Sequence, residues 1–239
     1  MLDDADVLRI LTITAHPDDV DFGVAGSAAR WTSEGIDVSY CVVTDGDAGG
    51  FDADFPRAEV PALRRAEQLD AARVVGVTDV TFLGYPDGRL ETSIDLRRDL
   101  SRVIRRVRPQ RVVCPSPQRL LSRLFVSHPD HLAAGEAALC AVYPDSRNPF
   151  AHPELAAEGL EAWTVDQVWL MGHESANRYV DITDTIDRKV KALLCHVSQM
   201  RQPDAMEERI RAWTAANAVQ GGLPPGSLAE AFFALDTAG

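Results

Sequence analysis

Two short segments of the chain combine imidazole and carboxylate side chains, and each segment follows a run of apolar residues. The six residues concerned are His16, Asp18, Asp19, His128, Asp130 and His131. The adjacent carboxylates of Asp18 and Asp19 repel each other, so stability alone does not favour them, whereas a bound cation does. Two histidines and one carboxylate suit a catalytic zinc ion, which keeps a further position open for water. The remaining carboxylate is then available as a general base, and the remaining histidine can face an oxyanion.

The spacing of these residues indicates how they can share one ion. His16 and Asp19 are close enough in sequence to bend toward the same cation while Asp18 points elsewhere. A helix that begins near Asp130 holds His131 on its first turn and gives that ligand a rigid base. His16 and His131 are far apart in sequence, so the fold has to bring the two segments together.

The rest of the sequence alternates short β-branched runs with longer helical patterns. We expect strands over residues 7–14, 36–44, 79–83, 111–114 and 165–171, with a short sixth over 180–182. We expect helices over residues 23–35, 61–75, 92–108, 130–143, 185–199 and 204–219. Thr92 and Asp95 resemble a capping box at the start of the third helix. The alternation predicts an α/β fold, a Rossmann-like three-layer α/β/α arrangement with a mostly parallel sheet.

In such folds, ligands bind outside the carboxyl ends of the strands, where the loops after the first, second and fourth strands meet. We expect a single domain over residues 1–239, in which the residues from about 201 form a C-terminal helical extension. Residues 221–226 are rich in glycine and proline and are expected to form a flexible break before a short tail. Gly23 and Gly26 do not complete a dinucleotide-binding motif, so a nucleotide cofactor is disfavoured.

The composition indicates a globular protein with reduced cysteines. Charged residues make up 25% of the chain, and the net charge of −12 with a pI near 4.9 disfavours nucleic acid as a partner. Cys41, Cys114, Cys140 and Cys195 are far apart and mostly have apolar neighbours, which favours reduced core cysteines. The acidic N-terminus is unlike a secretory signal, and no apolar run approaches the ~20 residues of a membrane span. We therefore expect a cytoplasmic protein.

The two His-Pro-Asp segments together resemble those of the PIG-L/LmbE-like N-deacetylase family. The main features are AHPDD after the first predicted strand and HPDH before a later helix, and the resemblance covers about residues 7–200. Further matching stretches are TDGDAGG, LRRAEQLDAARVVGV, GYPDG, YPDSRNPF and VDITDTIDRKVKALLCHVSQ. Family members are zinc-dependent hydrolases that remove acyl groups from amino sugars and related small molecules. The resemblance implies Zn²⁺, with Fe²⁺ or another divalent ion as the alternative, and an N-acylated amino sugar or glycoside as substrate.

The same resemblance implies a role for each of the six residues. The residues that resemble the zinc ligands are His16, Asp19 and His131. Asp18 resembles the general base that takes a proton from the attacking water. His128 matches the histidine that stabilises the tetrahedral intermediate, and Asp130 would orient that histidine. The sequence leaves open whether Asp18 or His128 protonates the departing amine.

Arg64 and Asp87 match positions that contact the sugar in this family, and Asp47 in the glycine-rich loop is a weaker match. Each has a plain structural interpretation as well. Arg64 can be a surface residue paired with Glu67 or nearby acids, Asp87 can belong to an ordinary turn, and Asp130 can cap the helix that follows it. Val126 is a departure from the family pattern, because some members carry a tyrosine there, two residues before the HPDH histidine.

Three further histidines are candidates of lower weight. His152 belongs to another His-Pro pair, but it follows no strand and is expected to be a loop residue. His173 ends the fifth predicted strand and therefore points toward the ligand-binding edge. His196 is expected on a late helix, where packing, an interface and catalysis all remain open.

Other functions remain open at this stage. An amidase that cleaves S-conjugates of a thiol cofactor would use the same site, and a catalytically silent sugar-binding relative would keep it. His16, Asp18 and His131 also satisfy the two-histidine, one-carboxylate pattern of non-haem iron oxygenases. The oxygenases with this spacing have an all-β fold, which the strand–helix alternation disfavours. Members of the family often assemble, so a homo-oligomer stays open too.

Overall fold

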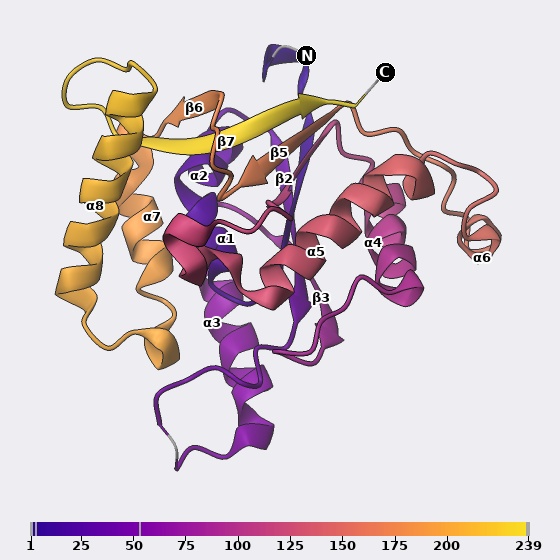
Figure 1. The fold of residues 1–239 in the computed structure, drawn as a ribbon, viewed down its shortest axis with the longest axis horizontal. Coiled ribbons are helices and arrows are strands. Elements are labelled where there is room, and N and C mark those ends of the chain that lie inside the picture. The colour runs from indigo at the N-terminus through magenta and orange to yellow at the C-terminus, as the bar shows by residue number, and fades with distance from the viewer. Residues whose placement is uncertain (1, 3, 53, 238–239) are drawn as a thin grey trace.

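One seven-stranded sheet runs through the molecule, with helices on both faces (Figure 1). The computed structural model describes residue 2, residues 4–52 and residues 54–237. The strands are β1 (Arg9–Thr14), β2 (Asp37–Thr44), β3 (Asp79–Tyr85), β4 (Arg111–Pro115), β5 (Gln167–Met171), β6 (Arg178–Asp181) and β7 (Ala229–Asp236). The helices are α1 (Asp19–Gly23), α2 (Ala25–Ser33), α3 (Val60–Val74), α4 (Ile94–Val107), α5 (Pro129–Cys140), α6 (Pro153–Ala157), α7 (Ile186–Leu193) and α8 (Pro203–Gln220). The predicted α/β fold is confirmed.

The strand order places a topological switch beside β1. The sheet has the order β3-β2-β1-β4-β5-β7-β6. The strands from β3 to β5 are parallel, whereas β7 runs antiparallel to β5 and β6. The chain moves outward from β1 to β3 and then returns to the other side of β1 to form β4. The loops after β1 and β4 therefore lie where open α/β sheets bind their ligands.

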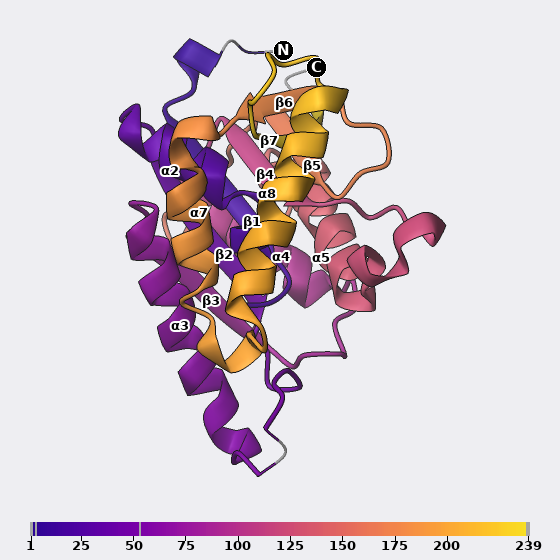
Figure 2. The same cartoon turned by 90° about the vertical axis from the view of Figure 1, so that its left-hand side faces the viewer.

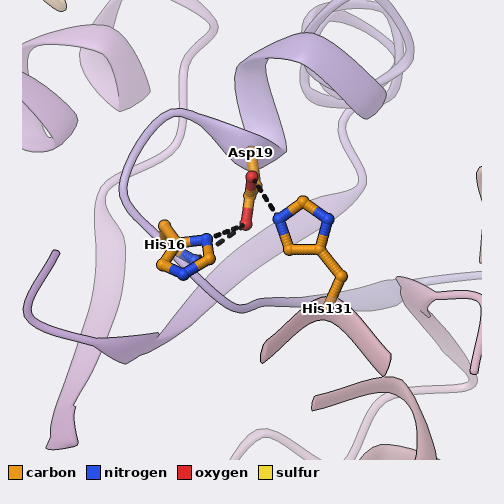
Figure 3. A group of neighbouring side chains, drawn as sticks. All are labelled: His16, Asp19 and His131. Carbon is orange, nitrogen blue, oxygen red and sulfur yellow. Dashed lines mark hydrogen bonds and ion pairs between the residues drawn. The ribbon is translucent and has the colours of Figure 1, made fainter. Parts of the chain in front are cut away.

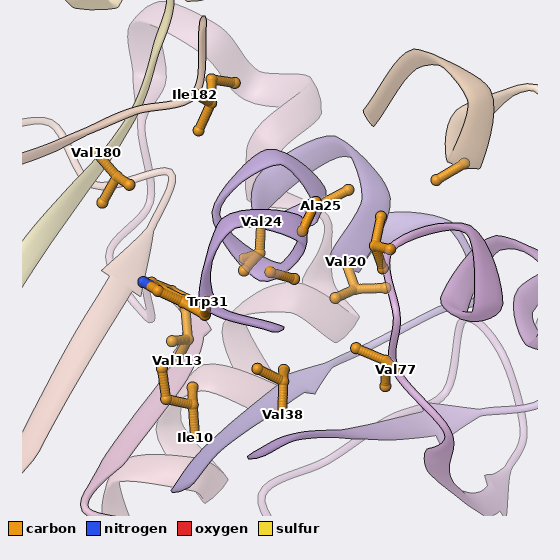
Figure 4. Close-up of a cluster of buried hydrophobic side chains, with 14 of the residues drawn as sticks. Ile10, Val20, Val24, Ala25, Trp31, Val38, Val77, Val113, Val180 and Ile182 are labelled. Carbon is orange, nitrogen blue, oxygen red and sulfur yellow. The ribbon is translucent and has the colours of Figure 1, made fainter. Parts of the chain in front are cut away.

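Two apolar layers hold the helices against the sheet. On one face, Ile10 and Val38 belong to a cluster that includes Trp31 and residues of α1, α3 and α7 (Figure 4). On the other face, Leu11 and Ile13 pack with residues of α4 and α5. Figure 2 shows α2, α3 and α7 on one side of the strands and α4 and α5 on the other. Successive strand residues point to opposite faces, and helices cover both faces, which is why every residue of β1 after Arg9 is buried.

The helix predicted over residues 23–35 begins earlier and is divided. The structure has α1 from Asp19 and α2 from Ala25, with Val24 between them at φ −138°. Gly23 ends α1 where a Cβ atom would lie 2.4 Å from Sδ of Met171, so only glycine fits there without a shift. At its other end, α1 begins immediately after Asp18, which places Asp19 in the first turn of the helix.

Two other helix predictions need correction. The N-cap of α4 is Ser93, whose Oγ accepts a hydrogen bond from the Leu96 amide at 3.1 Å, and not a capping box of Thr92 and Asp95. The helix predicted over 185–199 ends at Leu193 as α7, so His196 lies after the helix and before a short 3₁₀ turn.

The C-terminal part of the chain also differs from the prediction. The expected helix is present as α8, but the residues after 221–226 form β7 and not merely a short tail. This strand inserts between β5 and β6. Both partners lie much earlier in the sequence, so no local pattern indicates the pairing.

The cysteines and the membrane prediction can be compared directly with the structure. All four cysteines are free thiols. Cys41 and Cys114 are buried as predicted, whereas Cys140 and Cys195 are only half-buried and do not belong to the core. No helix within the described ranges combines the length and the apolar character that a bilayer crossing requires.

A buried ion pair ties the C-terminal elements to the start of the chain. Lys189 of α7 lies 2.6 Å from Glu230 of β7, and both side chains are fully buried. The Lys189 ammonium also donates to the backbone carbonyl of Asp21, while Glu230 accepts from the amides of Gly26 and Ser27. These contacts connect α1, α2, α7 and β7 at one point.

We expect Lys189→Met to lower the free energy of unfolding by about 3–5 kcal/mol, because the Glu230 carboxylate is left buried without its partner charge. Chemical denaturation followed by circular dichroism measures this loss. Arg98→Met removes partly exposed ion pairs with Asp95 and Asp99 and should change stability by about 1 kcal/mol or less. Equal losses in the two variants would contradict the prediction.

Candidate metal centre

The loop after β1 and the start of α5 bring three ligand side chains to one point (Figure 3). His16 and Asp19 come from the first segment, and His131 lies in the first turn of α5. The Asp19 carboxylate lies between the two rings, with Oδ2 3.3 Å from Nδ1 of His16 and Oδ1 3.0 Å from Nε2 of His131. One ligand atom of each residue lies within 4.8 Å of the others. The two distant segments therefore converge as the sequence predicted.

The spacing of these atoms fits a tetrahedral cation. Ligand bonds of 2.0–2.2 Å place two tetrahedral ligands about 3.4 Å apart. The outer nitrogen of each ring also faces an acceptor, as metal-binding histidines require. Nδ1 of His131 lies 3.1 Å from the Val126 carbonyl, and Nε2 of His16 lies 3.2 Å from Asp130 Oδ2. In the neutral form that binds a metal, each ring would therefore carry its proton on the outer nitrogen and offer the lone pair of the other nitrogen to the cation.

A second group of possible ligands shares one histidine with the first. His16, Asp87 and His128 also place one ligand atom each within 4.8 Å. In this arrangement His16 would use Nε2, which already faces the carboxylates of Asp87 and Asp130 at 3.1 and 3.2 Å. The set of His16, Asp19 and His131 leaves that hydrogen bonding intact, so it is the better fit.

The carboxylates around His16 determine its protonation when no cation is bound. Burial lowers the pKa of His16, but the charge of Asp19 and the hydrogen bonds to Asp130, Asp19 and Asp87 outweigh it and raise the pKa to about 12. Burial alone would raise the pKa of Asp19, yet His131 and His16 hold it well below its usual value. The site therefore concentrates negative charge that a proton or a metal ion neutralises.

Metal binding is expected to release protons and to tighten as the pH rises. Because the pKa of His16 is raised, the metal-free ring is protonated at neutral pH and must lose a proton to offer its lone pair. Each proton released makes the affinity about tenfold weaker for every unit by which the pH falls. Calorimetry of Zn²⁺ binding in two buffers of different ionisation enthalpy measures the protons released. A binding heat that is independent of the buffer would contradict this prediction.

Asp18 lies beside the ligands and makes different contacts. Its Oδ2 is 3.3 Å from Nη2 of Arg64, and the side chain is half-buried. Burial, together with the charge of Asp19, raises the pKa of Asp18 to about 6, although Arg64 opposes the shift. The backbone of Asp18 has φ +93°, a conformation that residues other than glycine rarely adopt and that is often found at functional sites. A carboxylate with a raised pKa next to the cation is suited to accept a proton.

His128 is the N-cap of α5 and faces the same space. Its Nδ1 accepts a hydrogen bond from the backbone amide of Asp130 at 3.2 Å, which leaves Nε2 to carry the proton of the neutral ring. Burial and the neighbouring charge of His16 lower the pKa of His128. A neutral ring with an Nε2–H donor therefore lies with its centroid 4.9 Å from that of His16.

Asp130, which was predicted to orient His128, contacts that ring through its main chain, while its carboxylate has other partners. The carboxylate lies 3.2 Å from His16 and accepts from the amides of Gly88 and Leu90 at 2.7 and 3.2 Å. Because Nδ1 of His128 accepts from the Asp130 amide, it has no proton to donate to that carboxylate. Asp130 therefore holds His16 and the turn after β3, and only its main chain contacts His128.

The structure brings the three residues expected to contact the sugar to the same edge. Asp87 lies 3.1 Å from Nε2 of His16, and Asp47 accepts from the Asp87 amide at 2.9 Å. Arg64 is buried and donates to the carbonyls of Pro17 and Gly46 at 2.6 and 3.0 Å. Arg64 thus joins the loops after β1 and β2 and supports Asp18.

The surface pairing considered for Arg64 is therefore wrong, and Val126 contributes through its main chain. Glu67 instead accepts from the amide and hydroxyl of Ser198, both at 2.7 Å. Val126 supplies the carbonyl that holds His131, a role that any residue there can fill. Val126 therefore lacks the hydroxyl that a tyrosine would supply at this position.

The other histidines have structural partners. His152 lies 3.6 Å from Asp145 in a loop, as predicted, and His173 stacks on Phe233 with 4.2 Å between ring centroids. His196 is buried, with Nε2 2.8 Å from Oδ2 of Asp21. Burial lowers the pKa of His196, but Asp21 outweighs this effect and raises it.

Sequence reasoning missed two residues next to the site, Asp21 and Gln68. The Gln68 side chain accepts from the Asp18 amide at 2.8 Å and donates to Asp21 at 2.9 Å. One signal was available for Gln68, because it follows Arg64 by four residues and so shares its helix face.

Comparison with known proteins supplies further observations. Residues 11–142 match the PIG-L family, described as GlcNAc-PI de-N-acetylase. The chain is 32% identical over 194 residues to the diacetylchitobiose deacetylase of Thermococcus kodakarensis, covering 81% of this chain and 71% of the relative. It is 29% identical to a probable N-acetyl-alpha-D-glucosaminyl L-malate deacetylase 2 of Bacillus cereus, covering 80% and 83% of the two chains.

A solved structure agrees closely with the fold. The N,N′-diacetylchitobiose deacetylase from Pyrococcus horikoshii, complexed with an inhibitor, superposes with a TM-score of 0.89 at 29% identity. The superposition covers 98% of this chain and 85% of that one. With the family match over more than half of the sequence, these similarities show that the chain belongs to the PIG-L family of N-deacetylases.

Proposed function

We propose that this chain is a zinc-dependent hydrolase that removes an acetyl group from the amide nitrogen of an amino sugar or its glycoside. The observation that supports it best is the placement of Asp18 beside the converging atoms of His16, Asp19 and His131. The relatives named as deacetylases of diacetylchitobiose and of N-acetylglucosaminyl malate support the substrate class.

The residues of the chain divide the chemistry among them. A bound divalent cation supplies Lewis acidity that activates water and polarises the amide carbonyl. Asp18 takes the proton of the attacking water, and Arg64 holds its carboxylate in place. His128 presents its Nε2–H to the oxyanion that develops on the carbonyl oxygen. The departing amine takes its proton from Asp18 after the attack or from His128.

Acidic side chains at the rim suit a polyhydroxylated substrate. Asp87 and Asp47 are half-buried on the loops after β3 and β2; Asp87 contacts His16, and Asp47 accepts from the Asp87 amide. Sugar hydroxyls donate hydrogen bonds to such carboxylates. Arg64 has one nitrogen 3.8 Å from Asp87, so its contribution to sugar binding is to hold Asp87.

The test is an amine-release assay on metal-loaded protein. N-acetylglucosamine, N,N′-diacetylchitobiose and N-acetylglucosaminyl conjugates of malate and inositol form the panel, with metal-free protein as the control. We expect amine release from at least one sugar, dependent on the metal. Sugar binding without amine release would instead indicate a silent relative, and cleavage of thiol-cofactor S-conjugates alone would indicate the amidase. The α/β sheet contradicts the oxygenase, which has an all-β fold.

A further inference from the structure

A buried hydrogen-bonded chain leads from the C-terminal part of the molecule to the backbone of Asp18. His196 Nε2 lies 2.8 Å from Oδ2 of Asp21, and the same oxygen accepts from Nε2 of Gln68 at 2.9 Å. Oε1 of Gln68 then accepts from the Asp18 amide at 2.8 Å. The side chains of His196, Asp21 and Gln68 are at most 1% exposed. None of the three belongs to the metal-binding set or faces it directly.

Each hydrogen bond in this series can have only one donor and one acceptor. The Asp18 amide can donate only to the carbonyl oxygen of Gln68, so the amide nitrogen of Gln68 must point the other way. That nitrogen needs an acceptor, which Asp21 supplies. His196 donates to the same carboxylate oxygen and holds it toward Gln68. Without His196, the buried Asp21 carboxylate loses one of its hydrogen-bond donors. It is then free to rotate, and its hydrogen bond with Gln68 is weakened.

The target of the chain is a strained residue. Asp18 has φ +93°, and strain of this kind persists only where the surroundings fix it. The hydrogen bond from the Asp18 amide to Gln68 restricts rotation about φ and so keeps the Asp18 carboxylate directed toward Arg64.

The segment that contains His196 is itself anchored to α3. Ser198 donates to Glu67 through both its amide and its hydroxyl, at 2.7 Å each. Glu67 precedes Gln68 on α3, so the helix that anchors this segment also carries the side chain that bonds Asp18. His196 is thereby held near Gln68 in two ways, through Asp21 and through the contact of Ser198 with Glu67.

We propose that His196 is a positioning residue that acts through Asp21 and Gln68 to hold the backbone of Asp18 in its active conformation. The proposal rests on the proposed function of Asp18 as the general base. It assigns a role to the late HVSQ stretch of the sequence. His196 contacts neither substrate nor metal in this role, so its loss acts on proton transfer and leaves binding intact.

The test compares His196→Leu with His196→Gln in the metal-loaded protein. His196→Leu removes both ring nitrogens, whereas His196→Gln restores an N–H donor on a side chain of similar length. We expect the leucine variant to lower kcat by about tenfold to a hundredfold, the scale of a misplaced catalytic group. Its KM and metal content should match the wild type, and the glutamine variant should recover most of the lost kcat.

Val190→Ala is the matched control, because Val190 is buried in the apolar cluster on α7 and has no side-chain hydrogen bond that could take part in the series His196–Asp21–Gln68. It should lower the melting temperature and leave kcat unchanged. Amide hydrogen exchange of the peptide covering residues 16–20 is the readout that does not need activity. It should become faster in His196→Leu and stay slow in Val190→Ala.

Several outcomes would overturn the proposal. These are wild-type kcat in His196→Leu, loss of metal in that variant, or losses of kcat that follow the melting temperature in both variants. If His196→Leu is poorly folded, Gln68→Glu replaces it, since the second oxygen of glutamate repels Asp21; unchanged exchange at residues 16–20 there overturns the proposal equally. Absence of amine release by the wild type, with the exchange pattern as expected, would reject the proposed function and keep the structural coupling.

Discussion

Asp18→Ala protein is expected to bind metal as the wild type does and to release amine about a hundredfold to ten-thousandfold more slowly, the range attributed to a general base. The metal should stay because the proposed ligands are His16, Asp19 and His131 and do not include Asp18. The activity should fall because, among the residues that the structure describes, Asp18 is the carboxylate next to the site that both pairs with Arg64 at 3.3 Å and has a raised pKa. Metal analysis and steady-state amine release on the same preparation measure the two effects.

The control variants separate charge from shape. Asp18→Asn keeps the size of the side chain and should be as slow as Asp18→Ala, because an amide cannot accept the proton. Asp70→Ala removes an exposed carboxylate farther along α3 and should leave both the metal and the activity unchanged. If Asp18→Ala retained activity within about tenfold of the wild type, Asp18 would not be the base.

The pH dependence of activity is a second test of Asp18 as the general base. Asp18 accepts a proton only when it is ionised, so activity is lost as the pH falls through its pKa, which is about 6 in the metal-free site. The positive charge of the bound ion stabilises the carboxylate and moves this limb to lower pH. In Asp18→Asn the limb should disappear from the residual activity.

The fold and the convergence of the candidate ligands could be predicted because both depend on local patterns. Apolar runs with the residues Ile10, Leu11 and Ile13 mark a strand buried on both faces, and the alternation with helices fixes a parallel sheet. Parallel strands place their loops at one edge, so a motif after β1 and another before α5 had to meet. Within one segment, the short spacing of His16 and Asp19 is enough to bring both side chains to the same point.

The contacts that the sequence did not reveal depend on distant segments. Asp130 is within two residues of His128, yet its carboxylate contacts His16 and the turn at Gly88. Arg64 is buried because two loops fold over it, which no helix pattern indicates. β7 and its Glu230 pair with elements from other parts of the chain. In each case the partner is set by tertiary packing, and a spacing rule cannot supply it.

His131→Ala is expected to lose the metal, and this is the second large effect. His131 is one of the three candidate ligands, and its ring is held at 3.1 Å by the Val126 carbonyl. Removing an outer partner of a ligand already weakens binding by about 10–100-fold, so removing the ligand should cost more. Zn²⁺ should therefore no longer raise the melting temperature of this variant, whereas it should raise that of the wild type.

The contrast between the two substitutions tests the division of labour at the site. His173→Ala is the matched histidine control, since His173 stacks on Phe233 and belongs to neither group of candidate ligands, and it should keep the metal. His131→Ala should be inactive through loss of metal, and Asp18→Ala should be inactive with metal bound. A His131→Ala protein that retained stoichiometric zinc would place the ion elsewhere, with the group of His16, Asp87 and His128 as the remaining candidate.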